Sequence, residues 1–159
     1  MDEAQHAAWL MRQPPSVATL AWLVDELDAA EVIEVSPMPG GSTSAMHRVA
    51  LIDRIGHQRV VVLRRYVRAE ILAPSPDVAA VEARALKLAE HVPLPTPTLL
   101  ALDATGDRAD VPALVMSLLD GRPVWETRWC SRWVSEVVDA MIALRDVDVS
   151  RSELPQLVT

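Results

Sequence analysis

A short glycine- and hydroxyl-rich segment has the clearest chemistry in the sequence. It consists of Gly40, Gly41, Ser42, Thr43 and Ser44, and it lies between two predicted strands. Glycine lets the backbone approach a polyphosphate closely, and hydroxyls and free amides can donate hydrogen bonds to its oxygens. The alternative is an ordinary hairpin turn, for which Gly-Gly is a common sequence. The segment alone is compatible with either structure.

Phosphate binding also needs a cation, and the composition restricts which residue can supply it. Lys87 is the only lysine, whereas there are fourteen arginines. Arg64 is one candidate, and it ends the β-branched run Val60-Val61-Val62-Leu63. A guanidinium can grip two phosphate oxygens with its planar fork. The alternatives are an exposed arginine at a strand end, or a register shift by one residue that gives the role to Arg65.

Composition excludes several other classes of protein. The net charge of -7 disfavours a broad nucleic-acid-binding surface. Cys130 is the only cysteine, so no intramolecular disulfide or cysteine-based zinc site can form. The first residues include Asp2 and Glu3 rather than a basic leader, and no apolar run reaches the roughly 18 residues of a membrane span. We therefore expect a cytoplasmic protein with no nucleic-acid or membrane partner.

The elements that would position these residues follow an unusual order. Periodicity and turn residues predict two helices, three consecutive antiparallel strands, one helix, two more strands and a final helix. The predicted helices are 3–12, one capped by Ser16, one starting at Asp77 and one capped by Ser131; the predicted strands start at Val32, then cover 46–52, 60–66, 98–102 and 113–119. Residues 71–76 are predicted to be a loop because they contain two prolines. The pattern predicts an α+β fold with a five-stranded antiparallel sheet.

This order, together with the motifs above, resembles the aminoglycoside phosphotransferase family of kinase-like enzymes. The resemblance implies a protein-kinase-like N-lobe with one packed helix, an N-terminal helical extension and the first helix of a truncated C-lobe. The corresponding ranges are 31–121 for the N-lobe, 1–30 for the extension, and 122–159 for the linker and first C-lobe helix.

The resemblance also implies roles for individual residues. Residues 40–44 would form the phosphate loop, although Ser44 stands where many relatives have asparagine. Arg64 would take the place of the kinase lysine, and Glu82 would pair with it; the alternative for Glu82 is a solvated helix face. Adenine would bind between Met116 and the hinge backbone of Ser117, Leu118 and Leu119, and Met116 is also compatible with simple burial.

The implied cofactor is ATP or GTP, with magnesium only in a full-length form and a small hydroxyl compound as acceptor. The family's His-Gly-Asp catalytic sequence does not occur in this chain, and His6, His47, His57 and His91 are all followed by other residues. All four histidines are predicted to lie at surface or loop positions. We therefore expect the chain to bind nucleotide weakly and to be inactive.

Three interpretations remain open at this point. The chain is a fragment of a small-molecule kinase, a complete non-catalytic module that binds nucleotide or a protein, or an unrelated α+β protein. A severed lobe would also expose apolar surface and would be expected to self-associate.

Overall fold

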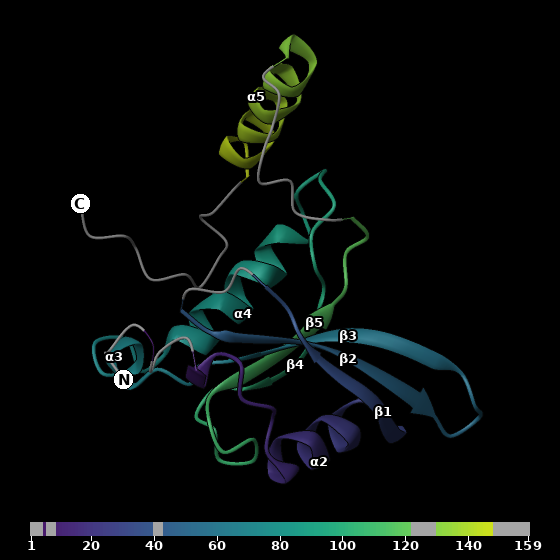
Figure 1. The fold of residues 1–159 in the computed structure, drawn as a ribbon. Helices are drawn as coiled ribbons and strands as arrows, with labels where there is room; N and C mark the ends of the chain where they lie inside the picture. The colour runs from purple at the N-terminus through teal and green to yellow at the C-terminus, as the bar shows by residue number, and fades with distance from the viewer. Residues whose placement is uncertain (1–4, 6–8, 40–42, 122–129, 148–159) are drawn as a thin grey trace.

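Five strands form one antiparallel sheet in the order β1-β2-β3-β5-β4 (Figure 1). The computed structural model describes residues 5, 9–39, 43–121 and 130–147. The strands are β1 (Ala29–Pro37), β2 (Ala45–Asp53), β3 (Gln58–Arg65), β4 (Leu99–Asp103) and β5 (Ala113–Ser117); the helices are α2 (Val17–Glu26), α3 (Ala69–Leu72), α4 (Val78–Ala89) and α5 (Ser131–Arg145). The predicted α+β architecture with its five-stranded antiparallel sheet is confirmed.

The sheet is apolar on both faces, as the central strand β3 shows. Side chains alternate along a strand, and Val61 and Leu63 belong to a different buried cluster from Val62. We call the face of Val61 and Leu63 the outer face, and the face of Val62 the inner face. Both faces of β3 are therefore buried.

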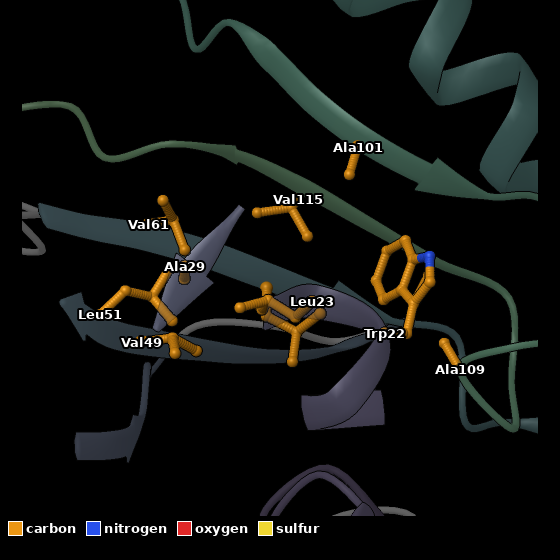
Figure 2. Close-up of a cluster of buried hydrophobic side chains, with 11 residues drawn as sticks. Trp22, Leu23, Ala29, Val49, Leu51, Val61, Ala101, Ala109 and Val115 are labelled. Carbon is orange, nitrogen blue, oxygen red and sulfur yellow. The ribbon is translucent and has the colours of Figure 1, made fainter. Parts of the chain in front are cut away.

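Helix α2 covers the outer face. Ser16 begins it, because its hydroxyl accepts a hydrogen bond from the Thr19 amide. Trp22 and Leu23 then point into a buried cluster formed with strand residues such as Val49 and Val61 (Figure 2). The N-terminal helical segment is thus part of the hydrophobic core and not only an appendage.

Helix α4 covers the inner face. Ala79 is fully buried against Val62, Tyr66, Leu114 and Met116. Small residues at this contact let the helix approach the strands closely, which brings the polar residues of the same helix near the end of β3. Figure 1 shows α2 and α4 on opposite sides of the sheet.

The loop between β4 and β5 is held by a carboxylate and connected to α2. Asp103 accepts hydrogen bonds from the amides of Gly106, Arg108 and Ala109 at 2.8–3.0 Å. The guanidinium of Arg108 also pairs with both Asp25 and Glu26 at the end of α2. These contacts join segments that are about 80 residues apart in sequence.

Some element boundaries differ from the predictions. Strand β1 begins at Ala29 instead of Val32, because residues of low strand propensity before Val32 also pair with β2. The register of this pairing shifts between Ala29 and Glu31 and again between Val32 and Glu34. A short helix, Ala69–Leu72, overlaps the predicted loop 71–76. The strand predicted to reach residue 119 ends at Ser117. Helix α5 is preceded by Cys130 at the cap position, so Ser131 is its first residue and not its cap.

Helix α5 lies apart from the sheet (Figure 1). None of its residues is buried, and its exposed apolar side chains are Val134, Val137, Val138, Met141, Ile142 and Leu144. Trp133 lies on this helix, whereas Trp125 and Trp129 fall outside the described residues. Half of the predicted helix 3–12, residues 3, 4 and 6–8, falls outside them as well. Within the described residues, no helix has the length and apolar character that crossing a membrane requires.

Candidate functional site

Arg64 and Glu82 meet on the inner face of the sheet. Arg64 lies on β3 two residues after Val62, so strand alternation points it toward α4, which carries Glu82. The Arg64 Nη1 and Glu82 Oε1 atoms are 2.5 Å apart, and each side chain is 24% exposed. The pair is therefore partly shielded from water but still reachable by a ligand.

Tyr66 completes this group. Its hydroxyl donates a hydrogen bond to Oε2 of Glu82, the oxygen that Arg64 does not use. The guanidinium carbon of Arg64 lies 5.5 Å from the centre of the Tyr66 ring, within the range of a cation–π contact. Burial, and then the hydrogen bond to Glu82, raise the pKa of the Tyr66 hydroxyl, which remains a donor at neutral pH.

Arg65 faces the other way. It is adjacent to Arg64 on the strand and therefore lies on the outer face, where it is 6% exposed. Its Nη2 donates to the Gln13 carbonyl at 2.5 Å, and burial lowers the pKa of its guanidinium. The register thus separates the two arginines, since only Arg64 lies beside Glu82.

The glycine segment is only partly visible. Gly40, Gly41 and Ser42 lie outside the described residues, so only Thr43 and Ser44 of the predicted phosphate loop are described. Thr43 is exposed, whereas Ser44 is buried just before β2 begins. The Met38 amide bonds to the Met46 carbonyl at 2.8 Å, which brings the two flanking strands together on either side of the segment.

The predicted hinge is a continuation of β5. Met116 is buried on the inner face, next to Val62 of β3 and Leu99 of β4. Ser117 is used within the sheet: its amide donates to the Thr98 carbonyl, and its hydroxyl accepts from the Thr98 amide, both at 2.9 Å. The Ser117 amide is thus not free for a ligand.

The two leucines of the predicted hinge follow the last strand. Leu118 packs against the inner cluster, and Leu119 is exposed. Since the Ser117 amide is already used, backbone recognition of a base at this hinge would fall to the amides of these two residues.

The burial of the polar residue His47 was not predicted. His47 is 1% exposed on the outer face of β2, so its predicted surface or loop position is wrong. Neither ring nitrogen has a hydrogen-bond partner in the part of the chain that the structure describes. Burial, and then the charge of Arg65, lower its pKa to about 4, against a smaller opposite effect of the Gln13 carbonyl. The sequence signal for this burial was its spacing: His47 lies two residues from each of the apolar residues Ala45 and Val49, so all three point to the same face of the strand.

The described residues contain no group of three or more histidine, cysteine, aspartate or glutamate side chains that could hold a metal ion. Separately, the Arg64 guanidinium on the inner face is a group whose chemistry suits an anion. A guanidinium has five N–H donors, and Arg64 Nε has no partner within the described ranges.

Comparison with solved structures identifies the fold. Over 89% of its length the chain superposes on a proposed aminoglycoside phosphotransferase from Ralstonia eutropha JMP134, with a TM-score of 0.63 and 16% identity. The chain has the fold of one part of a kinase-like phosphotransferase. The resemblance drawn from the sequence is thereby confirmed at the level of the fold, and the kinase-like chain spans 41% of the length of that protein.

A second solved structure also matches. It is a proposed fructosamine-3-kinase from Thermobifida fusca YX-ER1, with a TM-score of 0.46 and 23% identity. The match covers 69% of this chain and 34% of the length of that protein. No protein-family model and no curated protein sequence matches the chain.

Proposed function

We propose that this chain is the nucleotide-binding lobe of a small-molecule phosphotransferase, acting in the cytoplasm with ATP or GTP as phosphate donor. The observation that supports the proposal best is the Arg64–Glu82 pair on the inner face of the sheet. In a kinase-like lobe such a pair presents a fixed cation to the nucleotide phosphates. The fold match to a proposed phosphotransferase supports the same assignment.

The remaining roles in the proposal follow from position. The segment from Gly40 to Ser44 connects β1 to β2 and would cover the phosphates. The base would lie beside Met116, with the amides of Leu118 and Leu119 available to it. A small hydroxyl compound would be the acceptor, bound together with magnesium by residues outside this chain. The exposed apolar face of α5 would support self-association of the isolated lobe.

Nucleotide titration tests the role of Arg64. Arg64→Ala is expected to weaken ATP binding about tenfold or more, because a charge-assisted hydrogen bond to phosphate contributes about 1.5–3 kcal/mol. Adenosine, which has no phosphate, should bind the wild type and the variant equally. Isothermal titration calorimetry with both ligands measures the difference.

A matched control is Arg54→Ala, which removes a charge from an exposed ion pair with Asp28; both residues lie in turns just outside β1 and β2. Its ATP affinity should equal that of the wild type. Equal ATP affinities for Arg64→Ala and the wild type would refute the role of Arg64.

The 159-residue chain is expected to be catalytically inactive. Phosphoryl transfer needs a positioned acceptor and charge stabilisation of the transferred group, and this sequence contains no His-Gly-Asp segment. Incubation of the purified chain with γ-labelled ATP, magnesium and an aminoglycoside should release no phosphate above the buffer rate. Turnover that co-purifies with the chain and disappears in Arg64→Ala would contradict this prediction.

A further inference from the structure

We propose that Tyr66 is the positioning residue for Arg64: its ring and its hydroxyl together hold the arginine and the glutamate in one arrangement. The inference deepens the proposed function and rests on it only for the identity of the ligand, a nucleotide phosphate. The arrangement itself is a property of the chain and can be measured without any ligand.

The backbone of Tyr66 is fixed at the end of the sheet. Its amide donates to the Pro112 carbonyl at 2.9 Å, which extends the pairing of β3 and β5 by one step. Tyr66 lies two residues beyond Arg64 and hence on the same face, and it is 1% exposed. A side chain whose backbone is fixed in this way can restrict the conformations of the side chains that it contacts.

The ring restricts where the guanidinium can lie. An arginine has several rotatable bonds, and ordering them costs side-chain entropy. The Tyr66 ring offers the Arg64 guanidinium a surface at 5.5 Å, which favours one region of that rotamer space.

The hydroxyl restricts Glu82 in turn. One carboxylate oxygen accepts from Arg64 and the other from Tyr66, so turning the carboxylate away breaks at least one of the two interactions. Without the hydroxyl, one oxygen loses its partner and the carboxylate gains freedom. Arg64 is therefore held directly by the ring and indirectly through Glu82.

Two variants separate these contributions. Tyr66→Phe keeps the ring and removes only the hydroxyl, whereas Tyr66→Leu removes both. Val49→Ala is the control, because it truncates a buried residue of the outer cluster that contacts neither Arg64 nor Glu82 in the contacts described above. It is expected to lower stability and to leave the inner face unchanged.

The first measurement is the ¹⁵N order parameter of the Arg64 Nε–H group in the ligand-free protein, assigned by its loss in Arg64→Lys. We expect it to fall in Tyr66→Phe and to stay at the wild-type value in Val49→Ala. An unchanged order parameter in Tyr66→Phe would overturn the proposal, and this variant is conservative enough to fold.

The second measurement is binding of ATP and adenosine. Tyr66→Phe should weaken ATP binding about threefold and Tyr66→Leu about tenfold, with adenosine binding unchanged in both. Equal weakening of ATP binding in Val49→Ala would mean that stability alone is responsible and would also overturn the proposal. If the wild type binds no ATP, the proposed nucleotide function fails, while the order parameter still decides the role of Tyr66.

Discussion

Gly106→Ala is expected to destabilise the fold by about 3 kcal/mol. Gly106 has a φ of +83°, and a β-carbon built on it would lie 2.5 Å from the backbone carbon of Val111. A left-handed conformation costs a non-glycine residue about 1–2 kcal/mol, and overpacking against atoms that cannot move adds about 1–3 kcal/mol. The clash involves backbone, so no change of rotamer can relieve it.

The matched control is Gly56→Ala in the β2–β3 hairpin. Gly56 has a φ of +91°, but an added β-carbon would meet nothing within 4 Å. Only the backbone strain remains, and the expected loss is about 1 kcal/mol. Urea unfolding followed by circular dichroism should place the two variants in this order. Equal losses would mean that the backbone of Val111, within the same 104–112 loop, shifts away from the added β-carbon at little cost.

The second large effect is a loss of stability in mild acid caused by His47. Its pKa is lowered from 6.5 to about 4 in the folded chain. Between these values the unfolded chain binds a proton that the folded chain does not, so the free energy of unfolding decreases as the pH falls. The full effect amounts to about 3 kcal/mol, and it should be absent above about pH 7.

His47→Leu removes this titration and fills the same outer-face position with an apolar side chain. Urea unfolding at pH 7.5 and pH 4.5 should show a smaller difference for His47→Leu than for the wild type. His91→Gln, which changes an exposed histidine, should keep the wild-type difference. If His47→Leu loses as much stability in acid as the wild type, other groups govern the transition.

The strand order was predictable because the hydrophobic pattern and the turns agree along most of the chain. Ser16, Gly56 and the prolines after α4 mark boundaries through their own backbone preferences. Boundaries set by partners were not predictable in this way. Ala29 belongs to β1 only because Asp53 of β2 lies opposite it, and no local propensity of alanine reports that.

The candidate site divides along the same line. The pairing of Arg64 with Glu82 was predicted only because the resemblance to kinase-like enzymes implies it, and the structure brings the two side chains together. The choice between Arg64 and Arg65 depended on the register of the sheet, which three strands determine together. The sequence predicts only that Tyr66 ends a strand. Nothing in its sequence neighbourhood indicates that its hydroxyl contacts Glu82, a helix residue sixteen positions later.

The order of the strands also constrains how the chain can fold. β1, β2 and β3 are consecutive neighbours, whereas β4 is an edge strand whose partner in the described sheet, β5, follows it in the sequence. During synthesis the backbone of β4 therefore stays unpaired until β5 (Ala113–Ser117) has been synthesised and has paired with β3. Pairing β3 with β5 closes a long loop, a step whose entropy slows folding. We expect the β1–β3 meander to form first, and the contacts around the Arg64 side chain to form last.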